Sequence, residues 1–148
     1  MQTYWNVQQT IYTKGIRMIN FPEEDAKILK KHLFLSKAIE QIEEDKAHFE
    51  DAPLKINELY VEMLDRMLTT AKDERRELTK TMQDNNLKYV FRDEDRLFTG
   101  YEFFSNGKHK EVRYFNPMIL KHTKDIVAEL MYKYGGGDNM SDPKPPVF

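Results

Sequence analysis

An Asn-Gly pair at residues 106–107 constrains the fold of this chain more than any other feature. Two such residues between aromatic runs predict a β-hairpin, because a type I′ turn needs positive φ at both central positions. The tight turn places Tyr101 opposite Val112, whereas a three-residue loop would place Val112 opposite Glu102 and mix the two faces. Since a one-residue slip moves every side chain to the other face, the pattern favours the tight turn.

A third strand precedes this hairpin. A loop over residues 93–95 would pair Phe91 with Leu97 and add this strand to the same sheet. The chain is then predicted to form a three-stranded antiparallel meander with one apolar face that helices can cover. The candidate strands are 87–92, 96–104 and 109–115. The apolar face holds Leu87, Tyr89, Phe91, Leu97, Thr99, Tyr101, Phe103, Val112 and Tyr114.

The opposite face of the predicted sheet is mixed in character. It carries Phe98, Phe104 and Phe115 together with Arg113. Aromatic side chains exposed on a sheet indicate a partner, a second copy of the chain or the N-terminal segment lying across them. We therefore predict a partner-binding surface at these four residues. The other members of this face are Lys88, Val90, Arg92, Gly100, Glu102, His109 and Glu111.

The hairpin turn is followed by the basic residues Lys108, His109 and Lys110. Helices followed by a hairpin with such a tip resemble the wing of a DNA-binding domain, and the tip could contact phosphates. Against this, no short helix-turn-helix pair with a basic second helix precedes the hairpin. Residues 53–86 carry six basic and seven acidic residues, which is a poor composition for a recognition helix. Nucleic-acid binding is therefore the alternative interpretation, and protein binding is the leading one.

Two long helices are predicted before the sheet. The first begins at Pro22, after a candidate cap at Asn20, and repeats apolar residues every seven positions as far as Asp51. Its apolar stripe contains Ile28, Leu29, Leu33, Leu35, Ala38, Ile39, Ile42 and Phe49. The second follows Pro53, and its stripe contains Ile56, Tyr60, Met63, Leu64, Met67, Leu68, Ala71, Leu78 and Met82.

The length of the second helix leaves two alternatives. If it is continuous over residues 53–86, it is about 50 Å long. A lone domain of this size is only about 30–35 Å across. Either the helix breaks near Thr69 and Thr70, or its second half projects and packs on another copy of the chain, and we favour the second alternative.

A third helix is predicted after the sheet, capped by Asn116, with Pro117 in its first turn, and ending at the glycines of residues 135–137. Its apolar side contains Ile119, Ile126, Val127, Leu130 and Tyr134. We expect residues 20–134 to form a single α+β domain that is mainly helical, with two long antiparallel helices and this third helix packed on the meander. Residues 1–19 would be an arm docked on the same domain or on a second protomer, unless Met18 is the physiological start. Residues 135–148 would be a mobile, Pro-rich tail.

The junction Tyr114-Phe115-Asn116-Pro117, combined with the helix start FPEED at residues 21–25, carries a resemblance to a known family. Over residues 20–134 the chain resembles the YhjD-like family of small proteins from Bacillus-type Firmicutes. The resemblance implies a host in that lineage, or one of its phages or mobile elements. The shared motif is structural, so it carries no catalytic residue to this chain.

Composition excludes several classes of function. The chain of 148 residues has no cysteine, which excludes a thiol nucleophile, a disulfide framework and any Cys-based metal site. It has no apolar run long enough to span a membrane, and residues 1–20 lack the basic start and apolar core that are typical of a secretory signal. The four histidines are dispersed, and the pair Asp45 and His48 lies among charged helix-end residues. We expect a soluble cytoplasmic protein that is not an enzyme and needs no cofactor, metal or small-molecule substrate.

Charge is unevenly distributed along the sequence. Residues 22–51 carry five Lys and nine acids, whereas residues 96–124 carry six Lys or Arg and two Glu. These regions would attract one another within one chain or between two copies, or they would present an electrostatic face to a partner. We therefore expect a non-catalytic protein-interaction or regulatory module that forms a homodimer.

Overall fold

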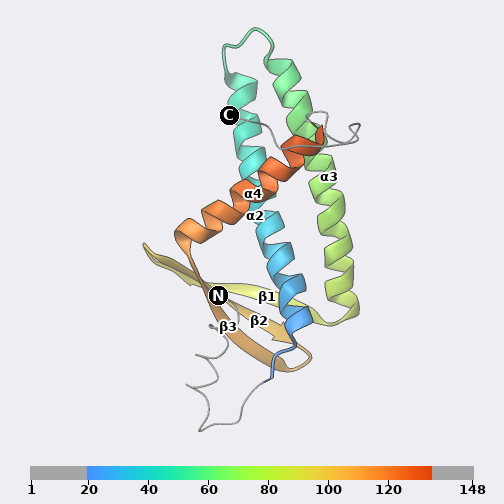
Figure 1. Cartoon of the computed structure of the whole chain (residues 1–148), viewed down its shortest axis with the longest axis vertical. Coiled ribbons are helices and arrows are strands. Elements are labelled where there is room, and N and C mark those ends of the chain that lie inside the picture. Colours follow the sequence, from blue (N-terminus) through green and yellow to red (C-terminus); the bar gives the residue numbers. More distant parts are fainter. Residues whose placement is uncertain (1–19, 135–148) are drawn as a thin grey trace.

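The computed structural model describes residues 20–134 and confirms the predicted α+β, mainly helical architecture. Two long antiparallel helices form a hairpin, the three-stranded sheet packs at one end of it, and the last helix crosses the hairpin (Figure 1). The elements are α2 (Glu23–Asp51), α3 (Asn57–Asp84), β1 (Leu87–Glu94), β2 (Phe98–Ser105), β3 (Lys108–Phe115) and α4 (Asn116–Tyr134). The predicted arm, residues 1–19, and the predicted tail, residues 135–148, lie outside the described residues.

Helix α2 begins at Glu23, and the residue at its cap position is Pro22 in an extended conformation. No side chain of residues 20–134 caps this end, so the prediction that Asn20 caps the helix is wrong. Three acids in the first turn supply the negative charge that favours the positive end of the helix dipole. The end of the helix is therefore stabilised by charge rather than by a side-chain hydrogen bond.

Helix α3 runs without a break past Thr69 and Thr70. It starts at Asn57 rather than at Pro53. Its second half does not project from the domain, contrary to the prediction, because Ala71 and Met82 are buried within the same chain. A helix of this length fits within one chain because the molecule is elongated: the helical hairpin extends well beyond the sheet (Figure 1).

The β2–β3 hairpin has the predicted tight turn. Asn106 and Gly107 have φ of 50° and 85°, as a type I′ turn requires. Tyr101 lies opposite Val112, and the pairing is regular from Phe98 with Phe115 to Ser105 with Lys108. The strand order β1-β2-β3 is the predicted meander.

The predicted register between β1 and β2 is wrong. Phe91 pairs with Tyr101 instead of Leu97, and Leu97 lies in the turn with 56% of its surface exposed. The turn lies further along the chain because the Asp95 carboxylate accepts hydrogen bonds from the backbone N–H groups of Leu97 and Phe98, at 2.8 and 2.7 Å. A β-bulge between Phe91 and Asp93 absorbs the irregularity.

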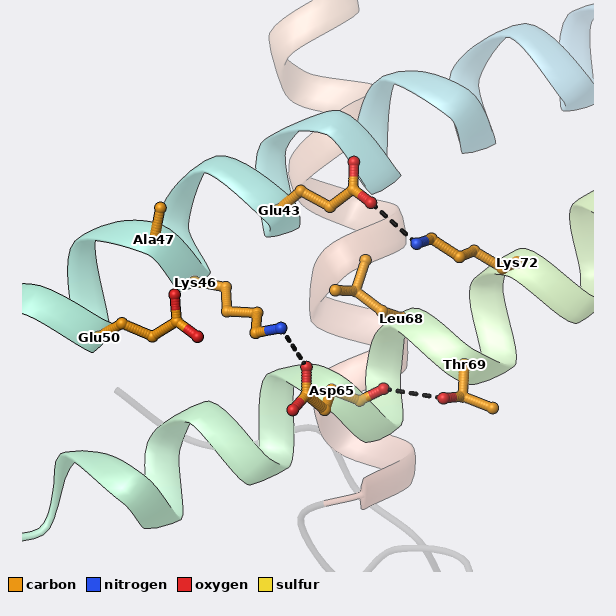
Figure 2. A pocket seen from close by; sticks show the side chains of 8 residues that line it. All are labelled: Glu43, Lys46, Ala47, Glu50, Asp65, Leu68, Thr69 and Lys72. Carbon is orange, nitrogen blue, oxygen red and sulfur yellow. Dashed lines mark hydrogen bonds and ion pairs between the residues drawn. The ribbon is translucent and has the colours of Figure 1, made fainter.

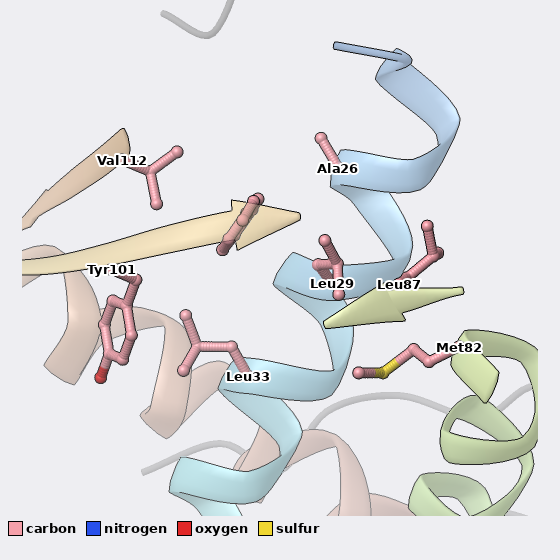
Figure 3. Packing of buried hydrophobic residues seen from close by; sticks show 8 residues of the cluster. Ala26, Leu29, Leu33, Met82, Leu87, Tyr101 and Val112 are labelled. Atoms are coloured by element: carbon pink, nitrogen blue, oxygen red, sulfur yellow. The ribbon is translucent and has the colours of Figure 1, made fainter. Parts of the chain in front are cut away.

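Two clusters of buried side chains form the core, and α2 contributes to both. The first lies between α2 and the sheet (Figure 3) and contains Ala26, Leu29, Leu33, Met82, Leu87, Tyr101, Phe103 and Val112. The second lies among the three helices and contains Leu35, Ile39, Ile42, Leu64, Met67, Leu68, Ala71 and Leu130. Two members of the predicted stripe of the second helix do not join the core: Ile56 and Tyr60 are 47% and 39% exposed.

Asn116 connects the start of α4 to the β1–β2 turn. Its backbone N–H donates to the carbonyl of Leu97 at 2.7 Å. Its side-chain amide donates to the carbonyls of Asp95 and Arg96, and its oxygen accepts from the Thr99 hydroxyl at 2.6 Å. The side chain therefore bonds to the sheet and its turn rather than serving as the predicted helix cap.

Candidate partner-binding site

The sheet face that points away from the helices, here called the outer sheet face, carries all four predicted partner-binding residues. Phe98 and Phe115 lie opposite each other on β2 and β3, with ring centroids 5.6 Å apart. They are 38% and 43% exposed, whereas Phe104 is half-buried. Strand alternation places these side chains on one side, and the inner residues of the same strands pack on α2.

Arg113 lies over the Phe98 ring, with its guanidinium carbon 5.9 Å from the ring centroid. The same guanidinium forms ion pairs with Asp93 at 2.7 Å and Asp95 at 3.5 Å. Gly100 leaves room for this arrangement, because a Cβ at that position would lie 2.7 Å from both Arg113 Nη1 and Asp93 Oδ1. The bulged end of β1 and the absence of a side chain at Gly100 together position Arg113.

Glu102 is the acidic centre of the other half of this face. Arg92 binds it at 2.6 Å and His109 binds it at 2.7 Å. Hydrogen bonding to Arg92, and then to His109, lowers the pKa of Glu102 below its ordinary value. Lys88 lies over the Phe104 ring, with its ammonium nitrogen 5.2 Å from the ring centroid.

The outer sheet face therefore combines exposed phenyl rings with several charges that already have oppositely charged partners. Covering an unpaired charge is costly, because the charge loses its hydration without compensation. Here Arg92, Glu102 and Arg113 each keep an oppositely charged group in contact. A second surface can therefore cover this face at a smaller desolvation cost than a face of isolated ions would require.

Both edges of the sheet carry features that discourage edge-to-edge pairing. On β3, Lys110 points to the inner side, where it is half-buried with its ammonium nitrogen 5.7 Å from the Phe21 ring centroid. Burial lowers the pKa of Lys110, and the nearby carboxylate of Glu23 opposes that shift. On β1 the bulge interrupts the ladder. Inward-pointing charges and bulges are common protections of edge strands, so the outer sheet face is the better candidate for contact.

The three basic residues of the predicted nucleic-acid contact do not lie on the same side of the hairpin. His109 lies on the outer sheet face, bound to Glu102, whereas Lys110 packs against Phe21 on the inner side. Lys108 is exposed, and within residues 20–134 it forms no ion pair. The three residues therefore do not present one basic surface.

A polar groove that was not predicted from the sequence lies between α2 and α3. Its volume is about 400 Å³, and Leu68 and Ala47 are its apolar members (Figure 2). Lys46 binds Asp65 at 2.8 Å and Lys72 binds Glu43 at 2.9 Å across it. The full lining is Glu43, Lys46, Ala47, Glu50, Asp65, Leu68, Thr69 and Lys72. Complementary charges on the facing sides of the two predicted helices were the signal that could have located it.

The described part of the chain offers neither a metal site nor a membrane span. Residues 20–134 contain no group of three or more His, Asp or Glu side chains that could hold a metal ion. None of the helices in that range is long and apolar enough to cross a bilayer.

Comparisons with known proteins agree with the resemblance noted from the sequence. The family described as YhjD protein matches residues 20–135, which include every described helix and strand. One relative, "Uncharacterized protein YhjD" of Bacillus subtilis (strain 168), is 27% identical over 115 residues, which cover 78% of this chain and 96% of the relative. No solved structure matches the chain. The chain belongs to the YhjD protein family.

Proposed function

We propose that this protein is a non-catalytic interaction module that associates with a second copy of itself through the outer sheet face. The observation that carries the proposal is the exposed Phe98–Phe115 pair on a face whose charged neighbours are already paired. Exposed apolar groups of this kind mark contact surfaces. We place the module in the cytoplasm, because a chain without cysteine gains nothing from an oxidising compartment.

A second copy suits this face because the face carries both signs of charge. In a two-fold symmetric contact each residue meets a different residue of the identical surface, so a face with Arg113, Lys88 and Glu102 can complement itself. Three strands of eight residues present an area of roughly 14 by 26 Å. This is small beside the roughly 800 Å² that each partner of a stable complex buries, so we expect association with a dissociation constant of about a micromolar or weaker.

Sedimentation velocity over a wide concentration range tests self-association. We expect the wild-type chain to shift from monomer to dimer as concentration rises. The double substitution Phe98→Ser/Phe115→Ser should leave it monomeric, because both exposed rings are lost. Leu54→Ser/Leu59→Ser is the matched control: these residues are 44% and 55% exposed at the other end of the molecule, and the control should still dimerise. A wild-type chain that stays monomeric at the highest concentration would exclude the proposal.

Nucleic-acid binding remains the second candidate and has less support. Of the three basic residues at the hairpin tip, Lys108 is the one that is exposed and without an ion pair in the described part of the chain. This candidate would be favoured if the protein bound a random DNA duplex, if the binding weakened with salt, and if Lys108→Ala abolished it. The absence of any binding at low ionic strength would exclude it.

A further inference from the structure

The distal end of the helical hairpin, residues 40–65, is strongly acidic and is here called the acidic tip. It contains nine Asp or Glu residues and two Lys, whereas the other described residues contain 18 Lys or Arg and 14 Asp or Glu. The excess negative charge of the described part is therefore concentrated in the acidic tip. Figure 1 shows this end of α2 and α3 at the opposite end of the molecule from the sheet.

The acidic tip also exposes a cluster of large apolar side chains. Leu54, Ile56, Leu59 and Tyr60 are 44%, 47%, 55% and 39% exposed. The connection that carries them is held in place, because the Asn57 side chain donates to the carbonyls of both Phe49 and Ala52 at 3.2 Å. The Tyr60 and Phe49 rings support it further, with centroids 5.5 Å apart. These apolar groups are therefore presented to solvent by an ordered turn.

The groove between α2 and α3 extends this surface along the hairpin. Of its three carboxylates, Glu43 is bound by Lys72 and Asp65 by Lys46. Glu50 also lines the groove, on the turn of α2 nearest the connection (Figure 2), and forms no ion pair within residues 20–134. Glu50 interacts electrostatically with Lys46 but has no ion pair in the described part of the chain, so it is the groove carboxylate most available to a cation from outside. Ala47 and Leu68 supply the apolar part of the lining.

Charge and apolar exposure together restrict what can bind here. The phosphates of nucleic acids and of anionic lipids are repelled by an excess of carboxylates, and so is the acidic tip of a second copy. The exposed leucine, isoleucine and tyrosine side chains require an apolar counterpart. We propose that the acidic tip and groove dock a basic amphipathic segment of another protein, with its Lys or Arg side chains meeting the carboxylates and its apolar side chains meeting the turn. This interaction goes beyond the proposed self-association and uses a separate surface.

Binding of a synthetic, fluorescently labelled amphipathic peptide of Leu and Lys tests the proposal by fluorescence anisotropy. Two control peptides separate the contributions: one replaces each Leu by Ser at equal charge, and one replaces each Lys by Glu. We expect both controls to bind at least about tenfold more weakly than the Leu/Lys peptide. Affinity for the Leu/Lys peptide should also fall as salt rises, because the carboxylates are exposed. Equal binding of the Ser peptide would overturn the proposal, because charge alone would then explain it.

Variants locate the contact on the molecule. Leu59→Ser/Tyr60→Ser and, separately, Glu50→Gln should each weaken binding of the Leu/Lys peptide severalfold. Phe98→Ser/Phe115→Ser should leave peptide binding unchanged. The proposal for the outer sheet face and the proposal for the acidic tip can therefore be contradicted independently. Unchanged affinity in both acidic-tip variants would exclude this surface as the docking site. Loss of self-association in the Leu59→Ser/Tyr60→Ser variant would show that a second copy covers the acidic tip, which would also overturn the proposal.

Discussion

Gly100 determines how Arg113 can lie on the outer sheet face. A methyl group there would come within 2.7 Å of the ends of both the Arg113 and Asp93 side chains. Both ends are flexible, so the pair would move rather than the backbone. The consequence of a substitution should therefore appear in binding rather than in folding.

We expect Gly100→Ala to weaken self-association while leaving the free energy of unfolding nearly unchanged. An exposed ion pair contributes little to stability, and Ala is favoured over Gly inside a strand. Urea unfolding and sedimentation velocity measure the two effects. Gly107→Ala is the matched control with the opposite pattern: nothing lies within 4 Å of its Cβ position, but φ is +85°, so it should cost about 1–2 kcal/mol of stability. Equal effects of the two substitutions on self-association would contradict the role given to Gly100.

We expect His32 to make the stability of this protein depend on pH. Its ring nitrogens bond to the Tyr89 hydroxyl at 2.8 Å and the Thr79 hydroxyl at 3.0 Å, connecting α2 to β1 and α3. Burial, and then the charge of Arg75, lower the pKa of His32 below its ordinary value of 6.5. The unfolded chain therefore takes up a proton more readily than the folded one. The contribution of His32 to the free energy of unfolding should be complete above pH 6.5 and be lost as pH falls through the lowered pKa.

His32→Gln should reduce this acid sensitivity, because Gln retains a donor and an acceptor without titrating. Urea unfolding at several acidic pH values gives, for each protein, the slope of the free energy of unfolding against pH. His48→Gln is the control, since His48 is an exposed histidine on the same helix. Some slope should remain in the variant, because burial and two nearby lysines also lower the pKa of His122. A slope identical to that of the wild type would contradict the assignment to His32.

Among the elements, the two turns of the sheet show what sequence can and cannot predict. The β2–β3 turn could be predicted because its geometry resides in Asn106 and Gly107 themselves. The β1–β2 turn could not, because strand alternation is equally satisfied by registers that differ by an even number of residues. The observed register differs from the predicted one by such a shift, so Leu87 and Tyr89 still face the helices. The position of the turn depends instead on the Asp95 side chain and on a bulge.

The candidate site divides in a similar way. Membership of the outer sheet face follows from alternation, so Phe98, Phe104, Arg113 and Phe115 could be placed on it. Which charges pair across it depends on side-chain conformations and on the bulge, neither of which is visible in the sequence. The exposure of Ile56 and Tyr60 could not be predicted either. A helical stripe indicates which side of a helix is apolar but not how far a neighbouring element covers it.

The link between α4 and the sheet should contribute measurably to stability. We expect Asn116→Ala to lower the free energy of unfolding by about 1–3 kcal/mol, because it removes three hydrogen bonds and leaves the Thr99 hydroxyl, on a residue only 4% exposed, without a partner. Urea unfolding measures the change. In a double-mutant cycle, Thr99→Val combined with Asn116→Ala should cost less than the sum of the single changes. Additive effects would show that the Thr99–Asn116 bond contributes nothing.

At the scale of the whole molecule, α2 joins the two core clusters into one folding unit. Leu29, 0% exposed, packs in the cluster beneath the sheet, and Ile39, 1% exposed, packs in the cluster among the helices. Because the same helix packs in both clusters, we expect a loss of packing in one cluster to destabilise the other.

Leu29→Ala and Ile39→Ala should each lower the free energy of unfolding by about 2–5 kcal/mol. Each should also lower the protection of backbone amides from hydrogen exchange throughout the domain. Hydrogen exchange followed by NMR, read in β2 and in α4, measures this cooperativity. Leu120→Ala is the control, because Leu120 is 52% exposed on α4 and should change stability little. Exchange that accelerates only in β2 after Leu29→Ala would show that the sheet and the helices unfold separately.

The unbroken course of α3 has a consequence for how the two surfaces relate in space. A helix of 28 residues is about 42 Å long, and it is braced along its length by α2. Within the described residues, α3 is unbroken from the end of the hairpin to the turn that precedes β1. Two molecules bound at those ends would therefore be held at a fixed separation of about 40 Å and in a fixed relative orientation, as by a rigid spacer rather than a tether.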